Sequence, residues 1–165
     1  ARRHRRQRAA VLIQAQAQRL RLYNLRPAVR DSAVYVERYE QSMDAVLLDA
    51  PCSGTGVMDN KPDVKFRLTP EGLESLIALQ ESLLDTVCRY VKPGGTLLYA
   101  TCILLPRENA DQVERFLARR PEFHMDALPP AVPEGFAAHG GAFGLQLLPH
   151  RDGTEGFFIA RMRRD

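Results

Sequence analysis

The chain has 165 residues, of which 45% are hydrophobic and 26% are charged. These proportions are typical of a soluble globular domain, so they exclude a disordered, collagen-like or disulfide-rich chain. The sequence contains neither a stretch as long as a membrane span nor a secretion signal. We therefore expect one cytoplasmic domain with no membrane partner.

Positive charge is concentrated at the start of the chain. The first thirty residues carry nine arginines, and the first acidic residue is Asp31. Such a segment could contact a polyanion such as nucleic acid, but a basic run alone favours a solvated, arginine-rich helix face. Apolar residues at helical spacing predict an amphipathic helix over Arg5–Leu25, followed by a short extended piece over Pro27–Arg30.

The middle of the chain alternates predicted strands and helices. Met43–Asp49 is a compact apolar run that predicts a strand buried on both faces, and a long loop follows it. A helix is predicted from Pro70, with Thr69 as its N-cap, and Lys92–Gly95 is expected to end it. Thr96–Cys102 then predicts a second buried strand.

The remaining elements complete the fold prediction. Glu108–Arg119 is expected to form a second crossover helix, and this strand–helix order predicts a mostly parallel α/β sheet. After an irregular loop, Gly144–Leu148 and Gly156–Met162 predict a terminal antiparallel hairpin.

Two of the three cysteines lie where ligands bind in such sheets. Cys88 is on the apolar face of the predicted helix and is expected to be structural. Cys52 and Cys102 each follow the carboxyl end of a buried strand, so paired strands about 4.8 Å apart would bring both thiols to one rim. A disulfide is disfavoured in a reducing cytosol, and a zinc site lacks further ligands at the right spacing, whereas two inert thiols stay an open alternative.

The residues around Cys52 suggest a particular chemistry. The run Asp49-Ala50-Pro51-Cys52-Ser53-Gly54-Thr55-Gly56 places a carboxylate and a thiol on one tight turn, and its two glycines allow close approach of a flat ligand. Attack on a pyrimidine uses such a set, because C5 of cytosine becomes nucleophilic only after a thiolate adds to C6. A base must then remove the C5 proton so that the thiol can leave.

Five ordered motifs carry a more specific resemblance. They are DAPCSGTG, the Lys61–Asp63 KPD element, KPGGTLLYATC, the Glu108-Asn109 pair and QLLPHRDGTEGFFIA. The chain resembles the Nop/Sun family of RNA cytosine-5 methyltransferases, especially the bacterial enzymes that modify small-subunit ribosomal RNA. The resemblance implies a Rossmann-like class I methyltransferase fold, S-adenosyl-L-methionine as cofactor, RNA (rRNA or tRNA) as partner, and no metal.

The resemblance also implies a role for each predicted catalytic residue. Cys102 would be the nucleophile that adds to C6, and Cys52 would assist proton removal and release of the RNA. Asp49 would hold the edge of the cytosine ring.

The same resemblance assigns binding residues. Asp31, Asp49 and Pro51 would contact the cofactor, although an ordinary loop or cap role explains Asp31 as well. Lys61 and Asp63 of the KPD element would contact the RNA.

One family feature is absent from the sequence. No glycine-rich cofactor loop precedes the first predicted helix, so residues 1–165 are expected to form a partial catalytic domain whose sheet lacks its first strands and which alone binds the cofactor weakly. Two alternatives stay open, a non-catalytic RNA-binding remnant and a DNA cytosine-5 methyltransferase.

Overall fold

The computed structural model describes residues 2–165, and all of their side chains except those of residues 2–6, 8, 9 and 67. The chain divides into two compact units, residues 1–32 and residues 33–165. A separate first unit was not expected from the length of the chain. None of the helices in residues 2–165 combines the length and apolar character that crossing a bilayer requires.

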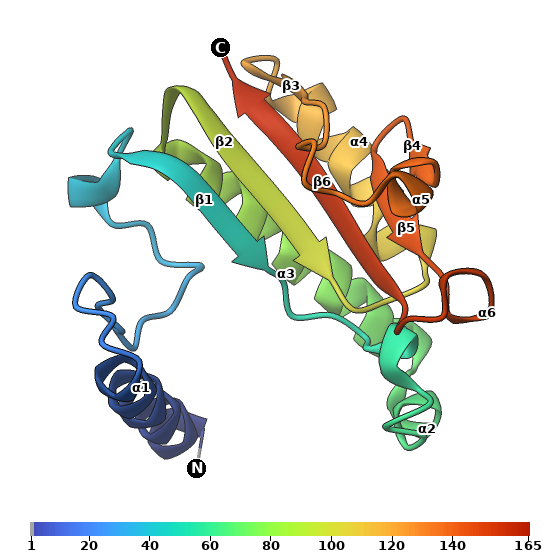
Figure 1. The fold of residues 1–165 in the computed structure, drawn as a ribbon, viewed down its shortest axis with the longest axis horizontal. Coiled ribbons are helices and arrows are strands. Elements are labelled where there is room, and N and C mark those ends of the chain that lie inside the picture. Colours follow the sequence, from blue (N-terminus) through green and yellow to red (C-terminus); the bar gives the residue numbers. More distant parts are fainter. Residues whose placement is uncertain (1) are drawn as a thin grey trace. The chain divides into compact units, whose positions relative to one another are not determined.

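The first unit is built on one helix. Helix α1 covers Arg2–Arg19 (Figure 1), so it ends earlier than the predicted Leu25. The chain turns at Arg21, which has a positive φ of 56°. Ala17 is buried, but Leu12 and Ile13 are exposed, so the predicted apolar face of α1 is mostly open to solvent.

The second unit contains a mixed sheet with the strand order β1-β2-β6-β5-β4 and with β3 also paired to β6. The parallel pairing of β1 with β2 and the antiparallel hairpin of β5 with β6 confirm two parts of the predicted topology. Antiparallel pairing is more extensive than expected, because β6 also runs antiparallel to β2 and β3. The strands are β1 Met43–Asp49, β2 Val91–Thr101, β3 Phe123–Met125, β4 Gly140–Gly141, β5 Gly144–Leu147 and β6 Phe157–Arg164.

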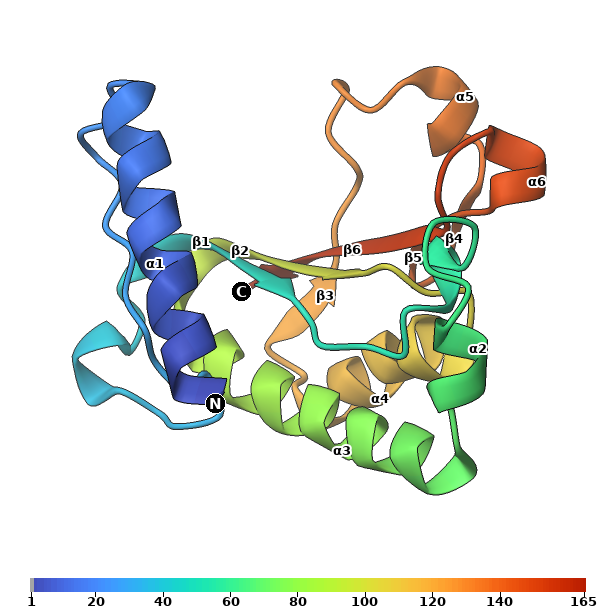
Figure 2. The same ribbon diagram turned by 90° about the horizontal axis from the view of Figure 1, so that it is seen from below.

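Two long helices cover one face of this sheet (Figure 2). They are α3, Pro70–Val87, and α4, Ala110–Arg119, and the short helices are α2 Val64–Arg67, α5 Glu134–Ala137 and α6 Pro149–Asp152. The predicted cap of α3 is confirmed, since the Thr69 hydroxyl accepts a hydrogen bond from the Gly72 N–H at 3.1 Å. Between the helices and the sheet lies the apolar core, which includes Leu84, Leu97, Tyr99, Phe116 and Phe158.

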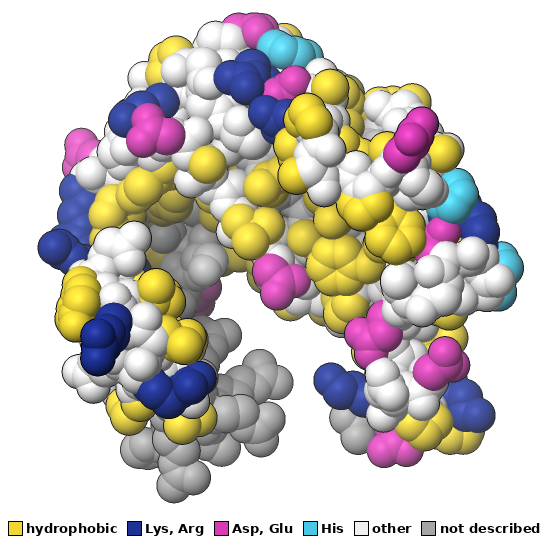
Figure 3. Space-filling model, in the orientation of Figure 1, with side chains coloured by type: hydrophobic (Ala, Val, Ile, Leu, Met, Phe, Trp, Pro, Cys, Tyr) yellow, Lys and Arg dark blue, Asp and Glu magenta, His cyan; other side chains and the backbone are white. Residues whose placement is uncertain are grey.

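Strand β1 is not buried on both faces, as its apolar run had predicted. Leu48 is buried, whereas Leu47 is 65% exposed. The reason is topological: β1 ends the strand order, and α3 and α4 cover only one face of the sheet. The face turned toward the viewer in Figure 1 shows apolar side chains between charged ones (Figure 3).

Two further boundaries differ from the prediction. Lys92–Gly95 does not end α3 but lies within β2, where the pairing register jumps from Met43–Val91 to Ala45–Thr96. Helix α4 begins after Asn109 rather than at Glu108, and it leads to β3, which pairs antiparallel with β6. Helix α3 is therefore the connection between the parallel strands, and α4 is not a second parallel crossover.

Candidate functional site

The two predicted thiols meet at the carboxyl ends of β1 and β2. The Sγ atoms of Cys52 and Cys102 are 3.5 Å apart, which confirms the expected convergence. Both cysteines are free and partly buried. At this separation one thiol donates a hydrogen bond to the other.

The environment of the pair favours a protonated Cys52. Burial, first, and then the hydrogen bond and charge of Cys102 raise the pKa of the Cys52 thiol to about 12. At neutral pH Cys52 therefore holds its proton and can donate it in a hydrogen bond to the Cys102 sulfur. Cys88 lies in the core, as predicted, and burial raises the pKa of its thiol to about 11.

Behind Cys52 lies a chain of buried hydrogen bonds. The Glu108 carboxylate accepts from the Ser53 N–H at 3.0 Å and from Gln80 Nε2 at 2.9 Å through the same oxygen, Oε1. Gln80 Nε2 also donates to the Pro51 carbonyl at 3.0 Å, and Gln112 Nε2 donates to Gln80 Oε1 at 3.1 Å. The backbone on both sides of Cys52 is thus tied to α3 and to the residues that open α4.

Asn109, which follows Glu108 in the chain, holds the residues on both sides of Cys102. Its Oδ1 accepts from the Thr101 hydroxyl at 2.6 Å, and its Nδ2 donates to the Ile103 carbonyl at 3.2 Å. Nδ2 also donates to Gln146 Oε1 at 2.6 Å, which links the site to β5. Gln80, Glu108, Asn109 and Gln112 are each at most 1% exposed, and together they are called the buried polar cluster below.

Gly56 has a structural use that differs from the expected one. Its N–H donates to the Cys102 carbonyl at 3.0 Å, and its own carbonyl accepts from the Gly156 N–H at 2.9 Å. A Cβ on Gly56 would collide with the Gly156 carbonyl. Gly56 therefore permits close approach of protein backbone, where the sequence had suggested a flat ligand.

The other predicted site residues lie at different places. Asp49, the last residue of β1, and Pro51 are both exposed at the same strand end as the thiols. Lys61 and Asp63 are exposed on the loop that leads into α2. Asp31 belongs to the first unit, whereas the two thiols belong to the second.

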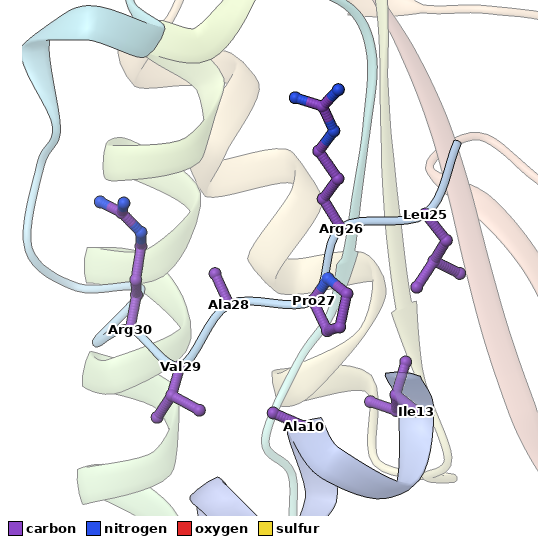
Figure 4. A pocket seen from close by; sticks show the side chains of 8 residues that line it. All are labelled: Ala10, Ile13, Leu25, Arg26, Pro27, Ala28, Val29 and Arg30. Carbon is purple, nitrogen blue, oxygen red and sulfur yellow. The ribbon is translucent and has the colours of Figure 1, made fainter. Parts of the chain in front are cut away.

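The first unit has a pocket of its own, with a volume of about 420 Å³. Figure 4 shows its walls, which come from α1 and from the segment that follows it: Ala10, Ile13, Leu25, Arg26, Pro27, Ala28, Val29 and Arg30. The lining is apolar apart from two arginines and includes no thiol. In the described part of the chain, no group of three or more His, Cys, Asp and Glu side chains is placed to hold a metal ion.

The sequence had singled out Glu108 and Asn109 only as part of a motif, and Gln80 and Gln112 not at all. A signal for Gln80 was present, because it stands at helical spacing between Ile77 and Leu84 on the apolar face of α3. A polar residue on such a face must find a buried partner. The identity of that partner depends on tertiary packing.

The mixed sheet with helices packed on one face is a Rossmann-like fold of the kind that methyltransferases have, and solved structures share it. The chain is similar to the protein PH0851, with a TM-score of 0.80 and 33% identity, over 90% of this chain and 33% of that one. It shares its fold with NSun6 from Pyrococcus horikoshii, solved with SFG, with a TM-score of 0.70 and 23% identity, over 92% of this chain and 37% of that one.

A family model described as 16S rRNA methyltransferase RsmB/F matches residues 1–163, so the chain belongs to this family and the predicted resemblance is confirmed. Ribosomal RNA small subunit methyltransferase B of Pasteurella multocida is 42% identical over 121 residues, which are 73% of this chain and 26% of the relative. The probable enzyme of the same name from Bacillus subtilis is 38% identical over 155 residues, 93% of this chain and 35% of the relative. The chain thus spans about a quarter to a third of the length of these relatives.

Proposed function

We propose that this chain carries the paired-thiol site of an S-adenosyl-L-methionine-dependent enzyme that methylates C5 of a cytosine in ribosomal RNA. The observation that carries the proposal is the 3.5 Å contact of two thiols at the ends of parallel strands, in a chain that belongs to an rRNA methyltransferase family. A disulfide or zinc site would also pair thiols, but both cysteines are free and the described residues offer no metal cluster.

The cofactor fits the chemistry of the strand end. When bound, S-adenosyl-L-methionine supplies the methyl group. Asp49 is exposed at the end of β1, so its carboxylate is available to accept hydrogen bonds from an amine or hydroxyl. We assign Asp49, Pro51 and Asp31 to cofactor contacts on the resemblance of their motifs to the family. The matching methyltransferase family supports S-adenosyl-L-methionine as the cofactor itself.

The first chemical step belongs to Cys102. Its thiolate forms a bond to C6 of the cytosine, and the electron pair of the C5–C6 double bond makes C5 nucleophilic. Asp49 holds the N3/N4 edge of the ring, which favours the addition. The protonated Cys52 thiol supports this step, because its S–H donates to the Cys102 sulfur and stabilises the thiolate.

The release step belongs to Cys52. Once the Cys102 sulfur is bonded to C6, it is a thioether, which carries no charge and accepts the Cys52 S–H only weakly. The charge of Cys102 and its hydrogen bond had both raised the pKa of Cys52, so this pKa is lower in the adduct than in the free enzyme. Burial still holds it above the pKa of a free thiol. Cys52 then assists the release: its own proton leaves to water, and the resulting thiolate accepts the C5 proton. The electron pair of the C5–H bond restores the C5–C6 double bond, and the C6–S bond breaks so that Cys102 leaves as a thiolate.

Replacement of each cysteine in the full-length gene product tests these roles. Cys102→Ala is expected to abolish methylation, whereas Cys52→Ala is expected to accumulate an RNA adduct that resists denaturant on a gel. Cys88→Ala, a thiol outside the site, is the matched control and should retain turnover. An adduct with Cys102→Ala, or with neither variant, would contradict the assignment.

The substrate requires a separate competition experiment. The exposed Lys61 and Asp63 are proposed to contact RNA, so ribosomal RNA should compete far better than a DNA duplex of the same sequence. Preferential methylation of the DNA would contradict the proposed substrate. RNA binding without methyl transfer would contradict the catalytic proposal.

A further inference from the structure

Glu108 and Asn109 are adjacent in the chain, and each forms hydrogen bonds with residues next to a different one of the two cysteines. Glu108 Oε1 accepts the N–H of Ser53, the residue after Cys52. Asn109 bonds the residues on both sides of Cys102, through the Thr101 hydroxyl and the Ile103 carbonyl. One dipeptide therefore fixes the backbone that carries each thiol.

The dipeptide is itself held from several directions. Tyr99 donates its hydroxyl hydrogen to the Glu108 carbonyl at 2.8 Å within the core, and Gln80 binds the Glu108 side chain. Asn109 has φ −114° and ψ −106°, which breaks the chain direction between the preceding 3-10 turn and α4. This break lets two successive side chains point to different strand ends.

We propose that Glu108 and Asn109 are positioning residues that hold the Cys52 and Cys102 thiols in contact. The sulfur–sulfur contact joins two segments fifty residues apart. The pairing of β1 with β2 ends at Asp49 and Ala100, and the pairing of β2 with β6 ends at Thr101, so neither thiol lies on a paired residue. The hydrogen bonds of Glu108 and Asn109 to the two loops, together with the bond from the Gly56 N–H to the Cys102 carbonyl, therefore hold the residues that follow the paired strands. The catalytic meaning of this placement rests on the proposed function, but the placement can be tested without RNA or cofactor.

For Glu108, the accepting oxygen rather than the charge is what the geometry requires. Oε1 faces two N–H donors, from Ser53 and Gln80, whereas Oε2 has no hydrogen-bond partner among the described residues. The amide of Glu108→Gln would keep its oxygen toward these donors, because its NH₂ group there would oppose two other N–H groups. Glu108→Gln should therefore retain the thiol contact, and Glu108→Ala should lose it.

Phenylarsine oxide is a suitable probe, because its arsenic binds two thiols only when both lie within reach of one atom. The reaction forms two As–S bonds and releases the oxide oxygen with the two thiol protons as water. It is carried out on the 165-residue chain, and displacement by a small dithiol gives the affinity. Cys52→Ala and Cys102→Ala define the signal for a single thiol.

We expect Glu108→Ala and Asn109→Ala each to weaken binding of the arsenical by about tenfold, as for the loss of one or two buried hydrogen bonds. Glu108→Gln should stay within about threefold of the wild type, as should Val113→Ala, a core truncation on α4 with no bond to either cysteine segment. Thermal unfolding checks that each variant is folded. Thr101→Val, which removes only the hydroxyl bound to Asn109, replaces Asn109→Ala if that variant does not fold, and it should also weaken binding.

Unchanged binding in Glu108→Ala and Asn109→Ala would overturn the proposal, and so would an equal loss in Val113→Ala. A loss in Glu108→Gln as large as in Glu108→Ala would overturn the role of the accepting oxygen. Because the assay involves no methyl transfer, failure of the proposed function leaves its outcome unaffected. In the full-length product, Glu108→Ala should lower the rate of adduct release while Glu108→Gln restores it.

Discussion

Helices α3 and α4 and the turn that precedes α4 carry two groups of polar side chains that differ in their access to water. The buried polar cluster faces the sheet and is almost fully excluded from solvent. On the outer side, Glu81 pairs with Arg115 at 3.0 Å and with Arg119 at 3.2 Å, and these side chains are 33–38% exposed. The same helix pair is thus joined by hydrogen bonds inside and by ion pairs outside.

Burial decides what each group contributes. A buried group that loses its partner keeps the full cost of leaving water, about 1–3 kcal/mol, whereas an exposed ion pair is screened and contributes about 0.2–1 kcal/mol. The buried polar cluster also touches the loops of both thiols, whereas the ion pairs join helix to helix. The buried polar cluster can therefore fix the positions of the loops that carry the two thiols. The exposed ion pairs mainly stabilise the packing of α3 against α4.

The largest expected effect on stability comes from the close backbone contact between Gly56 and Gly156. Gly56→Ala should lower the free energy of unfolding by about 3 kcal/mol, because the added Cβ meets the Gly156 carbonyl and the Cys102 backbone, neither of which is a flexible side-chain end. Urea unfolding followed by circular dichroism measures the change. Gly135→Ala, where nothing lies within 4 Å of an added Cβ, is the matched control. Equal stabilities of the two variants would show that the backbone near Gly56 has room for a methyl group.

A single change within the cluster comes next. Gln80→Leu should cost about 2 kcal/mol, because it removes donors from the Pro51 carbonyl and Glu108 and the acceptor for Gln112. The exposed neighbour Ser82→Ala is the control on the same helix. If Gln80→Leu leaves the free energy of unfolding unchanged, apolar packing can replace the hydrogen bonds of Gln80. The buried polar cluster would then contribute no more to stability than the exposed ion pairs.

The N-cap of α3 is expected to have a smaller effect. Thr69→Ala should cost about 1 kcal/mol, because the Gly72 N–H at the first turn loses its acceptor, and Thr69→Ser should restore most of it. The pair of variants is compared by urea unfolding. A loss in Thr69→Ser as large as in Thr69→Ala would show that the methyl group, rather than the hydroxyl, matters.

This cap is also an instance of what could be predicted from the sequence. Thr69-Pro70 and the apolar spacing of α3 are local signals, and so are the β-rich runs of β1 and β2, which is why these elements were located correctly. The meeting of Cys52 and Cys102 followed from the order of those elements alone. The exposure of Leu47 was not predictable in this way, because it depends on which strand ends the sheet and which face the helices cover.

The supporting residues of the site were missed for a similar reason. Gln80 and Gln112 read as polar interruptions of apolar faces, and only packing of α3 against α4 brings them within 3.1 Å of each other. Glu108 was assigned to a helix, but the break at Asn109 separates it from α4. Pairwise contacts between distant segments are thus the part of the site that local patterns do not encode.

The smallest effect is expected on the outer side of the helices. Glu81→Gln removes a carboxylate shared by Arg115 and Arg119, so it should lower the free energy of unfolding by about 0.5 kcal/mol at low salt. At about 1 M salt, where the screening length is about 3 Å, the difference from the wild type should largely vanish. The loss in Gln80→Leu should persist at both salt concentrations, because Gln80 and its partner Glu108 are buried and salt screens buried interactions much less. Glu114→Gln removes the same charge from an exposed position on α4 and is the control for a general charge effect. A salt-independent loss in Glu81→Gln as large as that in Gln80→Leu would break the comparison, since the ion pairs would then contribute as buried groups do.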